Sequence, residues 1–371
     1  MIQLFKPCLG KEEASAVLEV LKSGWIGNGP KTLEFEDKFS QFISAKHSLA
    51  LNSASASIHL ALLCAGVESG DEVITPSLTF VATNHPILML GAKPVFCDVQ
   101  EDTLCADAKD IIKKITNKTR AIVVVHYGGH PVDLDPIKKI CKEKGIKLIE
   151  DCAHASGTYY KGKHVGTVGD FGCFSFAAIK NLTTGDGGML VGKNEKLISK
   201  ARTYAWSGIS QSTWERVKDA KLKWQYNVTS TGWKYQMNDI AAAIGLVQLK
   251  KLVDSNKRRK DITEYYNRGL KKIPWIKVPV VKAYAKSSYH NYVIKVDAKV
   301  RDKLSGYLSK KGIATSVHYM PSHYYKLYSK YSHNVPVTEK VWKQILLLPI
   351  FPELSLKDQE FIVSTVEKFK P

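Results

Sequence analysis

The sequence has no run of about 18 consecutive apolar residues, which is what a helix needs to cross a bilayer. Its first residues, MIQLFKPCLGKEEAS, also lack the basic start and long apolar stretch of a secretion signal. We therefore expect a cytoplasmic protein without a membrane partner. The seven cysteines are scattered and form no Cys-x-x-Cys pair, which argues against a disulfide framework and against a zinc site. We expect no metal, and we find no internal repeat or low-complexity segment.

Acidic residues are scarce relative to basic ones: 35 Asp and Glu stand against 54 Lys and Arg, a formal net charge of +19. Such a surplus attracts polyanions, which makes nucleic-acid binding the first hypothesis to examine. The basic residues are spread along the chain, however, and no zinc-finger, RRM or KH motif accompanies them. We therefore expect no nucleic-acid partner. A lysine-rich solvated surface and a small anionic substrate such as a nucleotide diphosphate both fit the charge.

The length of 371 residues, with 44% hydrophobic and 24% charged residues, suits one large domain and one smaller domain. Short apolar runs typical of strands alternate with segments of helical spacing, such as 56–65 and 134–143. This alternation predicts an α/β fold with a large, mostly parallel sheet of about seven strands and helices on both faces. The predicted strands are 48–51, 72–75, 94–97, 121–125, 147–150, 173–176 and 189–191.

Two helices, 239–252 and 255–271, are predicted near the middle of the C-terminal half. We place the change of domain near residue 250, which gives a large domain of residues 1–250 and a smaller α/β domain of residues 251–371. The smaller domain is predicted to contain strands 290–296 and 315–319 and helices 300–311 and 356–369.

Ligands of open α/β sheets collect at the carboxyl ends of the strands, so polar residues that directly follow a strand are informative. The first such place is LALNSASAS, where small residues including Ser55 and Ala56 lead from a strand into a helix. Small side chains let a phosphate approach the backbone, and the N–H groups and dipole of the helix start favour its negative charge. Taken alone, the same residues are explained more simply by an ordinary serine N-cap.

The second place is KLIEDCAHASG, in which Asp151 ends a buried strand. A buried carboxylate normally has a cationic or hydrogen-bonding partner, because an uncompensated charge there costs several kcal/mol. A protonated pyridine nitrogen would serve as that partner, and His154 could reach the same ring from one side. A structural pair of the two residues is the alternative.

The third place is FGCFSFAAIKNLTTGDGG, in which Lys180 follows an apolar strand and precedes a glycine-rich turn. A lysine held in such a pocket loses pKa by desolvation, which frees its amine for imine chemistry. Ser175 could place a hydroxyl on a cofactor phosphate. A single lysine would be read as a surface residue, and only its flanking sequence argues otherwise.

Together these segments resemble the DegT/DnrJ/EryC1/StrS family of pyridoxal-phosphate (PLP) sugar aminotransferases over nearly the whole chain. The motifs that carry the resemblance are GWIGNGP (24–30), GDEVITPSLTFVAT (70–83), IEDCAHASG (149–157), FSFAAIKNLTTGDGG (174–188) and GWKYQMNDIAAAIGLVQL (232–249). The resemblance implies the type I aminotransferase fold and PLP as cofactor. It implies Lys180 as the Schiff-base lysine and Asp151 as the partner of the pyridine nitrogen. Phe80 would stack on the ring, and His154 stands where the family has His or Gln.

The resemblance also implies a homodimer with its active sites at the subunit interface. Lys234 lies in the region that would reach into the neighbouring site, where it would add positive charge near a phosphate; a solvated lysine is the alternative. The family often has Asn and Arg where this chain has Lys234 and Gln236. Some members replace the Schiff-base lysine with His and act as dehydratases, and the presence of Lys180 disfavours that branch.

The segment SVHYMPSHYYKLY resembles a histidine-rich stretch that lines the sugar-nucleotide pocket in the family, which makes His318 and Tyr319 candidates for substrate contact. Bidentate recognition of a carboxylate normally uses arginine, and this chain has only seven. Arg202 and Arg216 are the candidates for binding glutamate or a diphosphate, and surface placement explains them equally well.

The resemblance predicts transamination of a nucleotide-linked keto-deoxysugar, such as an NDP-4-keto-6-deoxyhexose, with L-glutamate as amino donor, for surface polysaccharide or glycan synthesis. One alternative is a PLP transaminase for a non-nucleotide keto-sugar, an ulosonate or an aminocyclitol precursor. The other alternative is a non-catalytic binding protein that keeps the fold.

Overall fold

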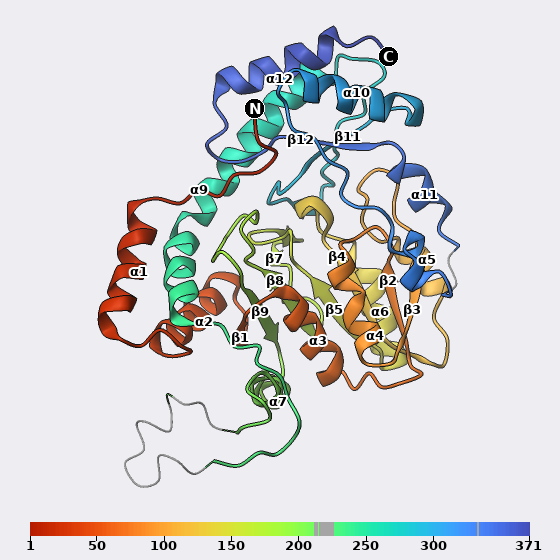
Figure 1. The fold of residues 1–371 in the computed structure, drawn as a ribbon. Coiled ribbons are helices and arrows are strands. Elements are labelled where there is room, and N and C mark those ends of the chain that lie inside the picture. The colour runs from red at the N-terminus through yellow and green to blue at the C-terminus, as the bar shows by residue number, and fades with distance from the viewer. Residues whose placement is uncertain (211–213, 215–225, 332–333) are drawn as a thin grey trace.

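The computed structural model describes residues 1–210, 214, 226–331 and 334–371. Their centre is a seven-stranded sheet with helices on both sides (Figure 1). The strand order is β1-β9-β8-β5-β4-β2-β3, and only β9 runs antiparallel to its neighbours. The strands are β1 (His47–Leu51), β2 (Glu72–Pro76), β3 (Lys93–Cys97), β4 (Thr119–Val125), β5 (Lys147–Asp151), β8 (Phe171–Ser175) and β9 (Gly188–Gly192). All seven predicted strands are confirmed.

The two faces of the sheet are covered by different helices, because side chains alternate along each strand. On β4, Ile122 and Val124 join the cluster formed with α2 and α6, whereas Ala121 and Val123 join the cluster formed with α3 and α7. The predicted α/β class is therefore confirmed. The helices around the sheet are α1 (Lys11–Ser23), α2 (Pro30–Ile43), α3 (Ala54–Cys64), α4 (His85–Met89), α5 (Ala108–Lys113), α6 (Leu134–Lys144), α7 (Glu195–Ala205) and the 3-10 turns η1 (Val81–Thr83) and η2 (Tyr127–Gly129).

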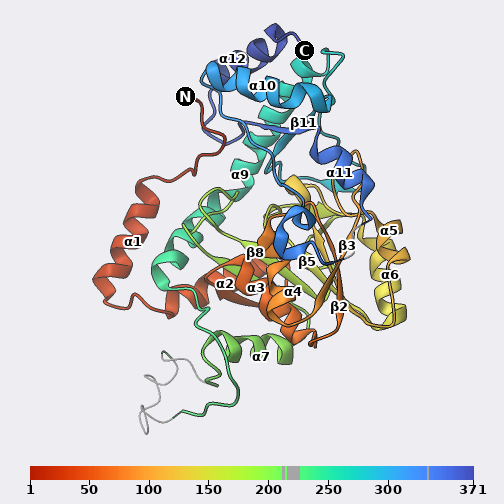
Figure 2. The same ribbon diagram turned by 45° about the vertical axis from the view of Figure 1, so that its right-hand side comes forward.

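One continuous helix, α9 (Asp239–Leu270), replaces the two helices predicted over 239–252 and 255–271. That prediction was wrong because no proline or glycine lies between residues 246 and 268, so nothing in the sequence interrupts the helix. Figures 1 and 2 show α9 running from α1 and α2 beside the sheet to α12 at the other end of the molecule. The chain has no break at residue 250, and the proposed domain limits stay a prediction.

The C-terminal part has its own hydrophobic cluster, built on the antiparallel pair β11 and β12 and on the end of α9. Ile2 and Phe5 from the N-terminus also pack against it. The strand predicted over 315–319 is absent: Ser316 forms only an isolated bridge to Leu347. The elements here are β11 (Tyr292–Lys295), α10 (Ala298–Lys310), η3 (Ser322–Tyr324), η4 (Lys326–Tyr328), α11 (Pro336–Trp342), β12 (Ile345–Leu348) and α12 (Leu356–Lys368).

A small three-stranded sheet that the sequence reading missed has the order β10-β6-β7. Its strands are β6 (Tyr159–Tyr160), β7 (Lys163–His164) and β10 (Ala285–Lys286), each only two residues long. Among the described helices, none combines the length and apolarity that a membrane span requires.

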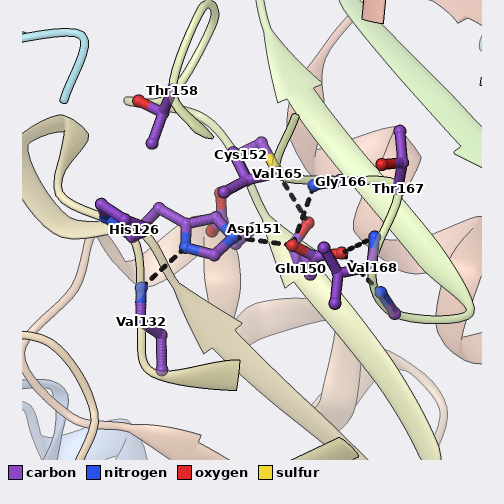
Figure 3. Close-up of polar contacts among 12 residues, drawn as sticks. His126, Val132, Glu150, Asp151, Cys152, Thr158, Val165, Gly166, Thr167 and Val168 are labelled. Atoms are coloured by element: carbon purple, nitrogen blue, oxygen red, sulfur yellow. Dashed lines mark hydrogen bonds and ion pairs between the residues drawn. The ribbon is translucent and has the colours of Figure 1, made fainter. Parts of the chain in front are cut away.

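A buried carboxylate on β5 fixes the loop between β7 and β8 (Figure 3). Glu150 accepts hydrogen bonds from the backbone N–H groups of Gly166 (2.8 Å), Val168 (2.9 Å) and Gly169 (2.6 Å). His126 Nε2 lies 3.0 Å from the same carboxylate, and the Val132 N–H donates to His126 Nδ1 at 3.1 Å. The imidazole therefore donates from Nε2. Both carboxylate oxygens are occupied by donors, so this cluster of Glu150, His126 and Cys152 is a satisfied structural network.

We expect Glu150→Gln to lower the free energy of unfolding by about 2–4 kcal/mol, because the amide nitrogen cannot accept from the loop N–H groups. Urea unfolding at pH 7 measures the loss. The exposed Glu143→Gln is the matched control and should change stability by less than about 0.5 kcal/mol. A variant as stable as the wild type would show that the loop does not depend on this carboxylate.

The hydrogen bonds of Glu150 also make the free energy of unfolding depend on pH. Burial alone would raise the pKa of Glu150, but the hydrogen bonds from His126 and the loop N–H groups more than offset it, and the pKa is lowered. A lowered pKa in the folded state means that the stabilisation is complete above the unfolded-state pKa of about 4.3 and is lost as the pH falls through the folded-state pKa. The stability difference between wild type and Glu150→Gln should therefore shrink in acid.

Candidate active site

A cavity of about 400 Å³ lies where the loops after β1, β2, β5 and β8 meet, at the carboxyl ends of these strands. This is the position at which open α/β sheets bind ligands. Eight of the residues singled out in the sequence line it, although they come from segments spread over more than 260 positions: Ser55, Phe80, Asp151, His154, Ser175, Lys180, His318 and Tyr319. Ala56 and Lys234 do not line this cavity.

Lys180 lies in the loop that joins β8 to β9, and its backbone N–H donates to the carbonyl of Ala177 at 2.9 Å. Burial of its amine lowers the pKa of Lys180 to about 8, although the nearby charge of Asp151 acts in the opposite direction. A neutral amine is thus accessible close to neutral pH. Such a lysine can attack a carbonyl carbon, which an ordinary surface lysine does poorly.

Asp151 ends β5 and is almost completely buried. Its carboxylate accepts from the Thr83 hydroxyl at 2.7 Å and from the Ala153 N–H at 2.9 Å. Burial raises the pKa of Asp151, while these two hydrogen bonds and the charge of Lys180 oppose the rise. Each carboxylate oxygen holds one of these bonds and has a second acceptor site, so the group can take a cationic donor from the cavity.

Thr79 and Thr83, to which the sequence analysis gave no role, support Asp151. Thr83 donates to Asp151, and the hydroxyls of Thr79 and Thr83 lie 2.7 Å apart. Both residues line the cavity from the segment after β2. Their spacing of four residues in a polar loop after a strand was a usable signal, since such loops carry ligand contacts.

His154 faces the cavity as a neutral imidazole. The Gly128 N–H donates to its Nδ1 at 3.3 Å, so the proton of the neutral ring is on Nε2, which lies 3.3 Å from the Tyr319 hydroxyl. Burial and the charges of Lys180 and His318 hold the pKa of His154 well below its usual value. The ring can therefore donate a hydrogen bond or stack, but it carries no charge at pH 7.

A second histidine, His290, was missed by the sequence reading and packs behind the first. Its ring stacks on His154 with centroids 4.4 Å apart, and its Nδ1 donates to Asn181 Oδ1 at 2.9 Å. Asn181 directly follows Lys180, and its amide also donates to the carbonyl of Ser288 at 2.8 Å. These contacts connect the loop that contains Lys180 to the segment before β11. No local sequence pattern predicts this connection.

The start of α3 offers backbone donors on another side of the cavity. The Ser53 hydroxyl caps the helix by accepting from the Ala56 N–H at 3.1 Å, and Ala56 itself is buried. Ala54 and Ser55 precede it in the first turn, where N–H groups have no partner within a helix. A side chain at Gly188 would come within 2.4 Å of the Ser53 backbone, so only glycine fits beneath this turn.

Three aromatic side chains lie on the remaining side. Phe80 is 56% exposed, and its ring centroid is 5.5 Å from that of Tyr319. The His318 ring stacks on Tyr319 at 4.5 Å, and its carbonyl accepts from the Tyr127 hydroxyl. Burial and the charge of Lys180 lower the pKa of His318 to about 4. Within the described part of the chain, His318 Nδ1 has no hydrogen-bond partner.

Known proteins with similar sequences and structures identify the family to which this chain is related. The spore coat polysaccharide biosynthesis protein SpsC of Bacillus subtilis is 39% identical over 369 residues, covering 97% of this chain and 95% of SpsC. Helicobacter pylori PseC, an aminotransferase involved in the biosynthesis of pseudoaminic acid, has a TM-score of 0.92 at 32% identity, covering 99% of this chain and 98% of PseC. The PLP form of Spr1654 from Streptococcus pneumoniae has a TM-score of 0.91 at 31% identity, covering 98% and 97%.

A model of the DegT/DnrJ/EryC1/StrS aminotransferase family matches residues 7–367. This chain belongs to that family. The enzyme class and the aminotransferase fold predicted from the sequence are therefore confirmed. The family works on sugars, and the chain is a transaminase.

Two basic residues of this aminotransferase lie outside the cavity. The Lys234 amine lies 3.5 Å from the centroid of the Trp206 ring and donates to Gln236 Oε1 at 3.2 Å. It lines a different groove, next to the Trp25 loop. Arg202 forms a two-point ion pair with Glu36, at 3.1 and 2.8 Å. Arg202 is not part of the cavity wall, so the structure gives it a structural role, and Arg216 lies outside the described residues.

The charge coupling in this aminotransferase predicts that Asp151→Asn lowers the pKa of Lys180 further below 8, because the carboxylate raises that pKa. The measurement is an NMR titration of the ¹³C-methylated, cofactor-free protein, in which the Lys180 signal is identified by its absence from Lys180→Ala. Asp135→Asn, which removes the partner of exposed Lys161, is the matched control and should leave the titration unchanged. An unchanged or raised pKa in Asp151→Asn would contradict the coupling.

Proposed function

We propose that this aminotransferase holds PLP on Lys180 and converts a nucleotide-linked keto-deoxysugar, of the NDP-4-keto-6-deoxyhexose class, to the amino sugar. L-glutamate is the proposed amino donor, and surface polysaccharide or glycan synthesis the proposed role. One observation carries the proposal: a lysine whose pKa is lowered to about 8 and a buried carboxylate line the same cavity. Imine chemistry needs the neutral lysine amine, and a cationic ring nitrogen needs the carboxylate as its partner.

The volume of the cavity and the chemistry of its lining residues support PLP as the cofactor. Its volume of about 400 Å³ lies in the range of small-molecule sites. The first turn of α3, with Ser55, and the hydroxyl of Ser175 would hold the phosphate. Asp151 would hold the ring nitrogen, and exposed Phe80 would lie against the ring. Spr1654, which shares the fold at 31% identity, has been solved in a PLP form.

When bound, PLP supplies an electron sink for the charge that develops at the amino-bearing carbon. The Lys180 amine would take a proton from that carbon and later return it, a task for which a pKa near neutral is favourable. Asp151 would hold the ring nitrogen of the cofactor in its charged form. His154, whose imidazole is fixed by its contact with Tyr319 and its stacking on His290, would orient the cofactor ring.

Two observations support a sugar nucleotide as the substrate. The net charge of +19 favours an anionic diphosphate over a neutral sugar. His318 lines the same cavity as Lys180 and is only partly buried, so its ring can contact a bound sugar. The relatives PseC and SpsC act in the synthesis of pseudoaminic acid and of spore coat polysaccharide, which supports a role in glycan synthesis.

We expect His318→Ala to raise the KM for the keto-sugar nucleotide about tenfold, the loss of one hydrogen bond, and to leave the KM for glutamate within about twofold. The lost contact belongs to one half reaction only. Steady-state kinetics with each substrate varied in turn measures the split. Tyr319→Phe keeps the stacking and tests the hydroxyl separately. An equal rise in both constants would contradict the assignment of His318 to the sugar.

We further propose a homodimer in which Lys234 completes the neighbouring site. Lys180→Ala and Lys234→Ala should each be impaired, whereas a mixture of the two after subunit exchange should recover about a quarter of wild-type activity. Half of the dimers would be mixed, and each of these would have one intact site of two. Assay of mixed and unmixed samples measures the recovery. If subunits demonstrably exchange and no activity returns, both lysines act within one chain.

A further inference from the structure

The loop Ser77–Asn84, which follows β2, forms part of the wall of the active-site cavity through Phe80 and Thr83. The Thr83 hydroxyl donates to the Asp151 carboxylate at 2.7 Å, and the Phe80 ring is one of the exposed groups of the wall. The position of this loop therefore decides where the ring of Phe80 and the hydroxyl that holds Asp151 lie.

Two consecutive residues of the C-terminal part, Ser322 and His323, hold the loop at both of its ends. At the start, the Ser322 N–H donates to the carbonyl of Ser77 at 2.8 Å, and the Ser77 hydroxyl lies 2.7 Å from His323 Nδ1. The His323 N–H also donates to the Ser77 hydroxyl, at 3.2 Å. At the end, the Asn84 amide donates to the Ser322 hydroxyl at 2.9 Å. We call the four residues Ser77, Asn84, Ser322 and His323 the clamp.

The neighbours of the clamp define the direction of its hydrogen bonds. His323 Nε2 lies 3.4 Å from the carboxylate of Glu339 on α11, which favours the proton on Nε2. Nδ1 of His323 then accepts from the Ser77 hydroxyl. At the other end, the Thr75 hydroxyl on β2 donates to Asn84 Oδ1 at 2.8 Å. Each end of the loop thus has a polar partner on both sides.

The clamp lies behind the cavity wall and not in it. Ser77, Asn84 and Ser322 are 0% exposed, His323 is 3% exposed, and none of the four lines the cavity. Their contacts join two stretches that do line it, residues 79–83 and residues 318–319. Buried polar groups that are bonded to one another favour a single arrangement of the segments that carry them.

We propose that Ser322 and His323 are positioning residues of this aminotransferase, which act through the loop to place the Phe80 ring and the Thr83 hydroxyl around the cofactor. The proposal rests on the PLP site proposed above. Without the bond between Ser77 and His323, the start of the loop loses its side-chain anchor. Contacts of the wall with the cofactor then weaken, because they depend on groups held to within a fraction of an ångström.

The probe for the test is pyridoxamine 5′-phosphate, which cannot form an imine with Lys180 and so reports the placement of the wall alone. Isothermal titration calorimetry measures its affinity for the full-length protein freed of cofactor. His323→Phe keeps a ring but has no acceptor, and it should weaken binding about tenfold. His323→Asn returns an acceptor at the position of Nδ1 and should bind within about threefold of the wild type. Ser77→Ala removes the same bond from the other side, which keeps the test decisive if His323→Phe does not fold.

A double-mutant cycle with Thr83→Val separates positioning from a purely structural role. In that background, His323→Phe should weaken binding of the probe by only about threefold or less, because the hydroxyl that it positions is already absent. His85→Phe is the matched control: it breaks a bond of 2.6 Å between His85 Nδ1 and the Tyr328 hydroxyl, outside the cavity, and should bind within about twofold of the wild type. An equal tenfold loss in both backgrounds would overturn the proposal.

Failure of the clamp and failure of the PLP site give different results. A wild-type protein that does not bind the probe would refute the PLP site. Hydrogen exchange of the peptide that spans residues 77–84, measured without any ligand, tests the clamp by itself. We expect His323→Phe to raise the exchange rate of these amides about tenfold or more, and His323→Asn and His85→Phe to stay close to the wild type. An unchanged rate in His323→Phe would refute the clamp, whatever the protein binds.

Discussion

The mutual effect of two ionisable groups in one buried cavity underlies the active site of this enzyme. Burial pushes both Lys180 and Asp151 toward their neutral forms, and the charge of each partly restores the charge of the other. The parallel pairing of β5 with β8 makes this possible, because both strands end at the same edge of the sheet. Thr83 and the Ala153 N–H then hold the carboxylate in place. The same edge receives the start of α3, and His318 and Tyr319 reach it from the C-terminal part of the chain.

Glu150 and Asp151 are adjacent on β5, and the alternation of side chains along the strand gives them different roles. Asp151 points into the cavity, whereas Glu150 points to the opposite face and is saturated by a histidine and three backbone donors. Burial acts on both carboxyl groups, yet the pKa of Glu150 is lowered and that of Asp151 is raised. The number of donors around each group makes the difference. A carboxylate with spare acceptor sites can serve a ligand, and a saturated one stabilises a loop.

The sequence predicted the sheet and much of the cavity because those features are local: a polar residue after an apolar strand must lie at the strand's end. It missed Asn181 and His290, since their roles depend on contacts between segments up to 136 residues apart, such as that of His154 with His290. It placed Ala56 in the wall although the serine cap occupies its N–H. It divided α9 between residues 252 and 255 although no proline or glycine interrupts that stretch. It predicted a strand at 315–319 because β-propensity does not report tertiary packing.

The segment Tyr127–Gly128 lines a second cavity, of about 260 Å³, and also holds two side chains of the cavity that contains Lys180. Tyr127 and Gly128 contact both His318 and His154 on one side and Asn291 on the other. If a ligand that shifts this segment changes binding at the Lys180 cavity by some factor, binding at the Lys180 cavity must change the affinity for that ligand by the same factor. Each ligand would then change the affinity of the protein for the other, although the two do not touch.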